Sequence, residues 1–361
     1  MKSICFVVIN AAVRGGLENV TTSLANELSD YYKTHIVSIY TSPGDKFAYE
    51  ADQRVTLTSL GLPTQRLTKL RRAVKEPLAD YINKNNIDIV FLEGNYTGFV
   101  GSSIKKSVKA KLVFADHGSL KGQSHDKKTL MCQFIASHLC DKTVLLTERN
   151  RKDYIRTYHL PPKKAVCIHN WIDPDVPCSQ NYDINSKRII SAGRLAPEKQ
   201  FDLLIKAFEP VYKKHPDWHL DIYGDGPLKD TLEELIKQLN LEENVHLMGM
   251  RTDLAQQYGK YSFYVLSSYR EGLPLVLLEA KSNRLPIISF NIPTGPEEII
   301  TDGVDGFLVA PYNIKELSNK MNYLIENPGL RISMSEKSQN NLDKFSKTTI
   351  LKQWIDLLES F

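Results

Sequence analysis

The stretch Phe263-Tyr-Val-Leu-Ser-Ser268, followed by Glu271-Gly-Leu-Pro-Leu-Val-Leu-Leu-Glu279, decides the fold prediction for this chain. The first segment is apolar and ends in two hydroxyls, which predicts a buried strand. The second passes through a Gly and a Pro into an apolar run, which predicts a turn and then a helix with Pro274 in its first turn. We therefore expect Glu271 on the turn and Glu279 about a turn and a half into the helix.

This unit places two carboxylates beside a helix N-terminus, where free N–H groups and the positive end of the helix dipole favour an anion. An anion bound there would have a carboxylate on either side. Such an arrangement suits a molecule with a central phosphate and hydroxyl-rich groups at both ends, such as a nucleotide sugar. The alternative is an ordinary strand–helix unit with two solvated Glu side chains.

Length and composition limit the possible classes. The chain has 361 residues, 42% hydrophobic and 24% charged, which predicts a globular protein of two domains. No apolar run approaches the roughly 20 residues that span a bilayer. The segment 2–9 is short and lacks a small-residue cleavage site, so it predicts a first strand and not a signal peptide. Five scattered cysteines without metal-site spacing predict reduced thiols in the cytoplasm.

Charge is divided unevenly along the chain. Residues 1–180 contain 25 Lys and Arg against 17 Asp and Glu, a formal charge of +8 (25 − 17). Residues 181–361 contain 21 against 25, a formal charge of −4 (21 − 25). A basic first half suits an anionic membrane surface or a phosphorylated acceptor.

Short apolar segments rich in Val and Ile recur in two series, with helical patterns between them. The first series comprises 4–9, 35–40, 87–92, 111–115, 142–146 and 165–169, and the second comprises 188–191, 219–223, 244–247, 263–266, 286–290 and 306–309. This alternation is typical of parallel α/β sheets covered on both faces. A segment rich in Pro, Asp, Asn and Ser, 173–186, predicts a linker. We therefore predict two doubly wound Rossmann-like domains, 1–172 and 187–344, facing across a cleft.

Two loops of the first half carry candidate site residues. Gly15 and Gly16 follow the first strand, where they let the backbone approach a ligand in front of a helix N-terminus. They are not part of a G-x-G-x-x-G motif, which argues against an NAD enzyme. His117 follows the strand ending at Ala115, a position from which it can touch a donor sugar or transfer a proton. The alternatives are a plain turn and a structural cap.

The segment 65–75 contains five basic residues and no acid. Leu67, Leu70 and Val74 fall on one helical face, so the segment predicts a basic amphipathic helix. Such a helix favours contact with a membrane surface or with a lipid pyrophosphate, and the alternative is a solvated helix face. The candidate acceptor or membrane residues are Arg66, Lys69, Arg72, Asn95 and Tyr96.

In the second half, Arg194 and Lys199 flank a loop between a strand and a helix. Two cations beside helix-end N–H groups form a clamp suited to a diphosphate, and the alternative is a pair of surface charges. Gly249 and Met250 follow a further strand and are candidates for backbone contacts with a base.

As a set, these motifs resemble the retaining glycosyltransferases of the large GT-B family 4, over nearly the whole chain. The motifs that carry the resemblance are Gly15-Gly16-x-Glu18, Gly193-Arg194-Leu195 with Glu198-Lys199, Gly224-Asp225-Gly226-Pro227, the E-x7-E of Glu271 and Glu279, Thr294-Gly295-Pro296-Glu297-Glu298-Ile299-Ile300, and Asp302-Gly303-x-Asp305-Gly306. Members in bacterial surface-polysaccharide pathways, such as capsule and lipopolysaccharide assembly, are the most similar.

The resemblance implies roles in the second half of the chain. Arg194 and Lys199 would hold the donor diphosphate and neutralise the leaving group. Glu279 would bind the ribose. Glu271 would contact the donor sugar and stabilise positive charge at the anomeric carbon.

The resemblance also implies roles in the first half. The amides of Gly15 and Gly16 would approach the diphosphate and the acceptor, and His117 would lie near the donor sugar. Residues 345–361 would form a helix that packs back on the N-terminal domain.

The implied activity is a retaining hexosyltransferase that moves a hexose or N-acetylhexosamine from a nucleotide sugar, with UDP expected, to a lipid-linked or surface-polysaccharide oligosaccharide. No metal or other cofactor is expected, because Arg, Lys and helix N–H groups replace Mg²⁺ and no Asp-x-Asp pair stands where a metal would be held. The expected location is the inner face of a bacterial plasma membrane, as a peripheral monomer or dimer that binds no nucleic acid.

Two other functions stay open at this point. One is a GT-B-fold sugar-nucleotide epimerase, against which the E-x7-E pattern argues. The other is a non-catalytic scaffold that binds a nucleotide sugar, against which the presence of Glu271 and Arg194 argues.

Overall fold

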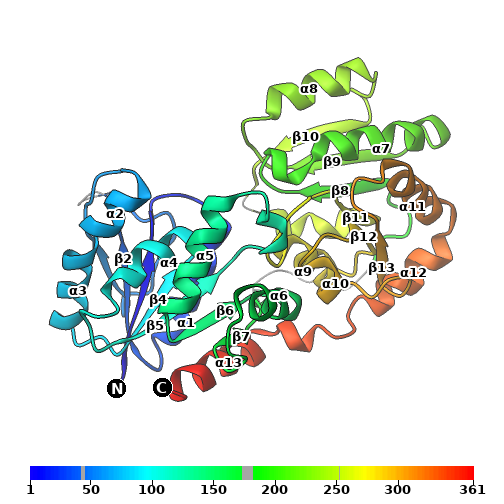
Figure 1. Ribbon diagram of the computed structural model, residues 1–361. Helices are drawn as coiled ribbons and strands as arrows, with labels where there is room; N and C mark the ends of the chain where they lie inside the picture. The colour runs from blue at the N-terminus through cyan, green and yellow to red at the C-terminus, as the bar shows by residue number, and fades with distance from the viewer. Residues whose placement is uncertain (42–44, 173–181, 252) are drawn as a thin grey trace. The chain divides into compact units, whose positions relative to one another are not determined.

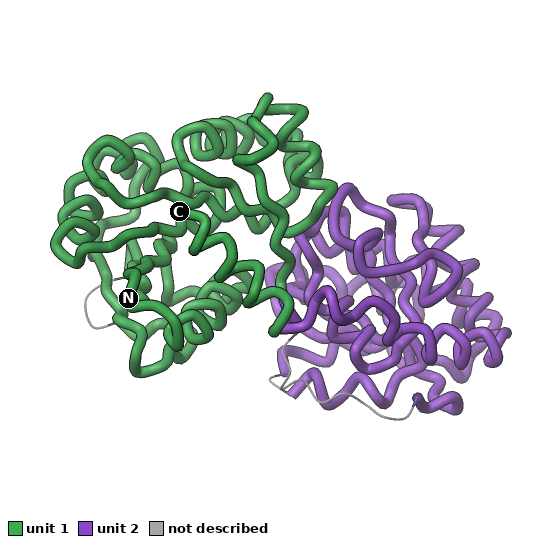
Figure 2. The backbone as a smooth tube through the Cα atoms, turned by 90° about the horizontal axis from the view of Figure 1, so that it is seen from below, with its two compact units in different colours: residues 1–170, 348–361 green, residues 171–347 purple. Residues whose placement is uncertain are grey.

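The computed structural model describes residues 1–41, 45–172, 182–251 and 253–361, and it separates the chain into two compact units (Figure 2). Unit 1 contains Met1–Asn170 and Thr348–Phe361, and unit 2 contains Trp171–Lys347. Most of the predicted linker, 173–181, lies outside the described residues.

Unit 1 is built on a seven-stranded parallel sheet of order β3-β2-β1-β4-β5-β6-β7. The strands are β1 (Ser3–Val8), β2 (Lys33–Ser38), β3 (Thr56–Ser59), β4 (Ile89–Glu93), β5 (Lys111–Asp116), β6 (Lys142–Leu145) and β7 (Ala165–Cys167). Strand β3 was not predicted; it is an edge strand of four partly or fully exposed residues.

The helices of unit 1 cover both faces of this sheet (Figure 1). They are α1 (Gly16–Leu28), α2 (Leu67–Ala73), α3 (Lys75–Lys84), α4 (Asn95–Gly101), α5 (Lys127–Leu139), α6 (Glu148–Tyr158) and α13 (Lys347–Glu359). Cys5 and Val7 of β1 join the core beneath α2 to α5. On the opposite face, Phe6 stacks on Phe91, and the Trp354 ring of α13 meets Phe91 edge-on at 5.5 Å. Successive strand residues therefore pack into two different layers, as in a doubly wound fold.

Unit 2 repeats this architecture with a six-stranded parallel sheet of order β10-β9-β8-β11-β12-β13. The strands are β8 (Arg188–Ala192), β9 (His219–Tyr223), β10 (Val245–Gly249), β11 (Phe263–Leu266), β12 (Ile287–Phe290) and β13 (Gly306–Val309). The helices are α7 (Phe201–Lys214), α8 (Lys229–Gln238), α9 (Leu275–Ser282), α10 (Pro296–Ile299), α11 (Ile314–Glu326) and α12 (Pro328–Lys337). The prediction of two doubly wound α/β sheets is confirmed.

In each sheet the strand order reverses once, between β1 and β4 in unit 1 and between β8 and β11 in unit 2. The Tyr264 hydroxyl of β11 accepts from the N–H of Ala192 at 2.9 Å and donates to the Ala192 carbonyl at 3.0 Å. These two hydrogen bonds satisfy the backbone polar groups of the last residue of β8, where β8 and β11 separate. Ligands of doubly wound sheets bind at such reversal points, beyond the carboxyl ends of the strands. The loops after β1 and β4 therefore form the candidate site of unit 1, and the loops after β8 and β11 form the candidate site of unit 2.

No helix in the described part of the chain combines the length and the apolar character needed to cross a bilayer.

Candidate functional site

The central contact of unit 2 joins the loops after β8 and β11. The Lys199 ammonium lies 2.6 Å from Oε1 of Glu271, and the Ser268 hydroxyl donates to the same oxygen at 2.7 Å. Both charged side chains are mostly buried, with 18% and 14% of their areas exposed. A cation and a carboxylate predicted separately from sequence therefore form one ion pair.

Further hydrogen bonds fix the geometry of these two loops. The Ser267 hydroxyl donates to the carbonyl of Lys199 at 2.7 Å, and the Tyr269 N–H donates to the carbonyl of Glu198 at 3.0 Å. The Thr294 hydroxyl donates to the carbonyl of Glu271 at 2.6 Å. These three hydrogen bonds within the protein therefore fix the backbone of the two loops that carry the ion pair.

Glu279 lies on α9, which follows this loop. Pro274 is the N-cap of α9, with an extended ψ of 104°. The prediction that Pro274 stands inside the first turn is therefore wrong. The hydroxyl of the fully buried Tyr258 donates to Oε2 of Glu279 at 2.8 Å. Burial and the Glu279 charge raise the pKa of Tyr258 well above its usual value, so the hydroxyl stays protonated and orients the carboxylate.

Glycines are required where the loops after β8 and β9 touch. Gly224 has φ +137°, and a Cβ there would stand 1.9 Å from the carbonyl oxygen of Gly193. The Gly224 N–H donates to the carbonyl of Gly249 at the end of β10, at 2.9 Å. This close approach sets the position of the loop that carries Arg194, whose side chain is exposed, and of Met250, which is 71% exposed.

Next to the reversal point of unit 1, His117 and Glu93 form a second contact, between the ends of the adjacent strands β5 and β4. Nε2 of His117 lies 2.6 Å from Oε2 of Glu93, which is buried. Burial alone would lower the pKa of His117, but the hydrogen bond and charge of Glu93, with the charges of Asp116 and Glu18, raise it. A protonated imidazole is favoured as a result, and a buried anion supports it.

The glycine loop lies beside this pair. Gly15 is the N-cap of α1 and Gly16 its first residue. A Cβ on Gly15 would meet the Glu18 carboxylate at 2.5 Å, whereas a Cβ on Gly16 would meet nothing within 4 Å. Packing against the described residues therefore does not require Gly16, which leaves close approach of a ligand as a reason for it.

The remaining predicted residues of unit 1 belong to α4, to α2 and to the N-cap of α2. Arg66, Lys69 and Arg72 are exposed, and so is Tyr96, over whose ring the Lys128 ammonium lies at 5.2 Å. The Asn95 amide donates to Gln123 at 3.2 Å, below the surface.

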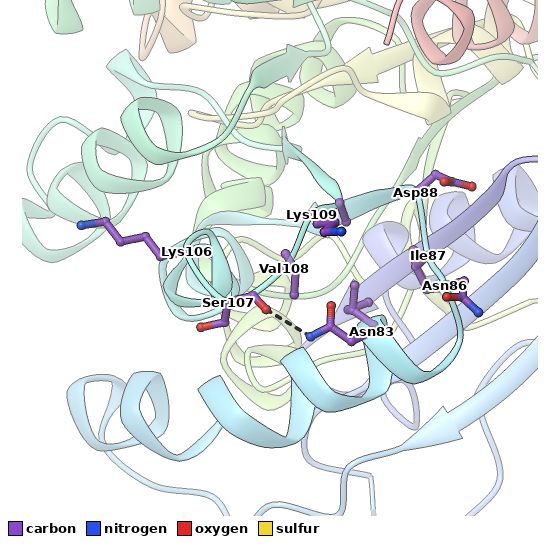
Figure 3. A pocket seen from close by; sticks show the side chains of 10 residues that line it. Asn83, Asn86, Ile87, Asp88, Lys106, Ser107, Val108 and Lys109 are labelled. Atoms are coloured by element: carbon purple, nitrogen blue, oxygen red, sulfur yellow. Dashed lines mark hydrogen bonds between the residues drawn. The ribbon is translucent and has the colours of Figure 1, made fainter.

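The pocket in Figure 3 lies away from all of these residues. Its lining includes Asn83, Asp88, Lys106 and Lys109, at the amino-terminal ends of β4 and β5, the edge of the sheet opposite the reversal-point loops. No predicted site residue lines it, so it does not change the choice of site.

Sequence reasoning missed four residues that position the predicted ones: Glu93, Tyr258, Ser268 and Thr294. Ser268 and Thr294 stood inside quoted motifs without an assigned role. Glu93 stands one residue beyond the predicted end of its strand, and that buried position was the signal available for it.

Chemically, the loops after β8 and β11 present a lysine ammonium, an exposed guanidinium and the Glu271 carboxylate, and α9 adds the carboxylate of Glu279. Cations there favour a phosphate, and carboxylates favour sugar hydroxyls. The arrangement suits stabilisation of a departing phosphate.

Comparison with known families agrees with this chemistry. The family described as "Glycosyltransferase Family 4" matches residues 14–176, and the family described as "Glycosyl transferases group 1" matches residues 179–341. The two matches together cover most of both units.

Individual relatives extend over the whole chain. An uncharacterized glycosyltransferase of Haemophilus influenzae is 27% identical, over 99% of this chain and 100% of its own. The amylovoran biosynthesis glycosyltransferase AmsD of Erwinia amylovora is also 27% identical, over 99% and 100%. A 4-alpha-N-acetylgalactosaminyltransferase of Campylobacter jejuni, named for a diphospho-undecaprenol substrate, is 25% identical over 95% and 96%.

A solved structure has the same fold. Staphylococcus aureus TarM, solved with fondaparinux, alpha-GlcNAc-glycerol and UDP, superposes with a TM-score of 0.84 at 18% identity, covering 99% of both chains. The chain therefore belongs to the glycosyltransferases of group 1 and family 4, which have the GT-B fold.

Proposed function

We propose that this chain transfers a hexose or N-acetylhexosamine from a UDP-sugar to a lipid-linked or surface-polysaccharide oligosaccharide, with retention at the anomeric carbon and without a metal ion. The observation that carries the proposal is the Lys199–Glu271 ion pair, held at the reversal point of unit 2 by Ser268 and Thr294. TarM was solved with UDP, which supports UDP as the nucleotide.

In the proposed step, the bond between the anomeric carbon and the diphosphate oxygen breaks. The acceptor hydroxyl oxygen bonds to that carbon on the same face, and its proton passes to the departing phosphate oxygen. Lys199 and Arg194 stabilise the charge on the leaving diphosphate. Glu271 holds Lys199 in place and stabilises positive charge on the sugar.

The other residues bind and orient the donor. Glu279, oriented by Tyr258, binds the ribose hydroxyls, and the backbone at Gly249 and Met250 contacts the base. Gly15 and Gly16 contact the diphosphate, and His117, kept protonated by Glu93, donates to the donor sugar.

The relatives support the acceptor class. AmsD is named for amylovoran biosynthesis, and the Campylobacter enzyme for transfer to a diphospho-undecaprenol glycan. We propose a lipid-linked oligosaccharide as the acceptor, handled at the inner face of a bacterial plasma membrane.

A donor screen tests the proposal. Purified protein is incubated with UDP-Glc, UDP-Gal, UDP-GlcNAc, UDP-GalNAc and GDP-Man, each with and without a lipid-pyrophosphate-linked acceptor extract, and the released nucleoside diphosphate is measured. Acceptor-stimulated release from one UDP-sugar, unchanged by EDTA, is the expected result. NMR of the product's anomeric configuration tests retention.

Other outcomes identify other functions. Epimerisation or hydrolysis of the donor without an acceptor indicates an epimerase. No release from any donor, with no thermal shift on adding UDP or GDP, indicates a non-catalytic scaffold.

A further inference from the structure

Helices α2, α4 and α5 lie side by side on one face of the unit 1 sheet, with α4 between the other two (Figure 1). Their inward residues, including Leu70, Phe99 and Ala136, belong to the core. We define the basic–apolar face as eight exposed residues on these helices and at the N-cap of α2: Arg66, Lys69, Arg72, Tyr96, Lys127, Lys128, Met131 and Phe134.

The α5 part of this face is unusually apolar for an exposed helix surface. Met131 is 46% exposed and Phe134 47%, and together with Lys127 and His138 they form one stripe at a spacing of four, three and four residues. Tyr96 of α4 adds a ring that is 39% exposed. A surface helix normally has polar residues on its outer side, so the exposed Met131 and Phe134, which stand between Lys127 and His138, are an unusual apolar feature of α5.

The α2 part of this face is basic. Arg66, Lys69 and Arg72 form no ion pair within the described part of the chain, and α2 contains no acidic residue. Asp126, the acid at the start of α5, caps that helix by accepting from the N–H groups of Lys128 and Thr129. The charges of Arg66, Lys69 and Arg72 are therefore unpaired among the described residues, whereas Asp126 lies beside Lys127 and Lys128.

We propose that the basic–apolar face docks unit 1 on an anionic lipid bilayer. Met131, Phe134 and Tyr96 enter the boundary between headgroups and acyl chains, while the Arg and Lys side chains bind lipid phosphates. An anionic bilayer complements both the positive charge and the exposed rings of this face.

The docking inference rests on the proposed function in one respect: docking would give the enzyme access to a lipid-linked acceptor. Binding itself requires no catalysis, so the two proposals can be tested separately.

Cosedimentation with vesicles of phosphatidylglycerol and phosphatidylcholine tests the docking. We expect binding that requires phosphatidylglycerol and weakens as NaCl increases. The double variants Lys69→Glu/Arg72→Glu and Met131→Ser/Phe134→Ser should each bind at least about tenfold more weakly, and the second should also lose the binding that persists at high salt.

Matched controls lie outside this face. Lys33→Glu/Lys352→Glu makes the same change in net charge at exposed positions on β2 and on α13, which covers the opposite face of the sheet. Tyr31→Ser removes a ring that is 50% exposed after α1. Both should bind vesicles within about twofold of the parent, and circular dichroism should show every variant folded.

Three results would overturn the inference. The first is no binding of the parent chain to phosphatidylglycerol vesicles at low salt, and the second is an equal loss of vesicle binding in the control variants. The third is unchanged vesicle binding by Met131→Ser/Phe134→Ser together with a changed mass of the protein in light scattering. The third result would assign this face to contact between copies of the chain. A chain that binds vesicles but releases no nucleoside diphosphate would remove the proposed function and leave the docking intact.

Discussion

At the scale of single residues, the proposed chemistry depends on charges held close together by neutral neighbours. Lys199 and Glu271 come from different loops, and hydroxyl groups fix both the carboxylate and the backbone beneath each residue. Pre-positioned charge stabilises a transition state more effectively than charge that must reorganise during the reaction.

Replacing the central carboxylate by its amide tests this arrangement. Glu271→Gln keeps the shape and a hydrogen bond to Ser268 but removes the negative charge, so we expect kcat to fall by about 10²-fold while the melting temperature changes little. Release of nucleoside diphosphate and thermal unfolding measure the two quantities. Ser268→Ala is the control, because it removes one neutral hydrogen bond and should cost less than about tenfold. Wild-type turnover by Glu271→Gln would exclude the proposed role.

The His117–Glu93 contact predicts a pH dependence of stability. Because Glu93 raises the pKa of His117 despite its burial, the stabilising contribution is complete below the ordinary histidine pKa and is lost as pH rises through the raised value. The difference in free energy of unfolding between the parent and His117→Gln should therefore be larger at pH 6 than at pH 9. Urea titrations at both pH values measure it, and equal differences would contradict a charged pair.

Sequence predicted one partner of this pair and missed the other. His117 stands where strand-end residues contact ligands, so position alone identified it. Glu93 is 24 residues away, and its approach depends on β4 and β5 being neighbours in register, with Glu93 opposite Ala115. That adjacency is a property of the folded sheet and has no local sequence signal.

At the scale of elements, most strands were predictable because parallel strands buried on both faces are continuous apolar segments. The exception, β3, has the sequence Thr-Leu-Thr-Ser at a sheet edge, where only one neighbour and partial burial are needed. Such a strand depends on β2 for its existence, and its own composition does not distinguish it from a loop.

The N-terminus of α1 offers a test that separates folding from ligand binding. Gly16→Ala adds a methyl group that meets nothing within 4 Å, so stability should stay the same or rise by up to about 1 kcal/mol. Turnover should fall if a diphosphate approaches this backbone. Gly329→Ala in α12 also adds a methyl group in open space and should leave turnover unchanged. Equal activity of both variants would remove Gly16 from the donor site.

At the scale of the whole molecule, unit 1 is assembled from two distant parts of the chain. Its last helix, α13, returns to the sheet through Trp354, through the Tyr32 hydroxyl, which donates to Glu359 at 2.8 Å, and through the Lys2 ammonium, which donates to the carbonyl of Leu358 at 2.9 Å. The core of unit 1 therefore depends on residues that follow all of unit 2.

Removing the ring of Trp354 should destabilise unit 1 by about 3–5 kcal/mol, since the side chain is 6% exposed and fills the layer against Phe91. Calorimetry with and without UDP identifies the unfolding transition whose midpoint UDP does not raise. The Trp354 variant should show a lower midpoint than the parent chain for that transition. Lys352→Ala, an exposed change on the same helix, should leave that midpoint unchanged. Identical midpoints for the two variants would exclude α13 from the core.

This discontinuous organisation has a consequence for synthesis on the ribosome. Domains usually fold one after another as they emerge, at about 5–20 residues per second. Here the first Rossmann-like sheet emerges early. The ribosome must then synthesise the 177 residues of unit 2 (Trp171–Lys347) before α13 can cover the open face of that sheet. Unit 2 can be complete while the earlier unit still exposes the apolar surface around Phe91. A nascent chain of this enzyme is therefore most vulnerable to proteases and most dependent on chaperones in its oldest part.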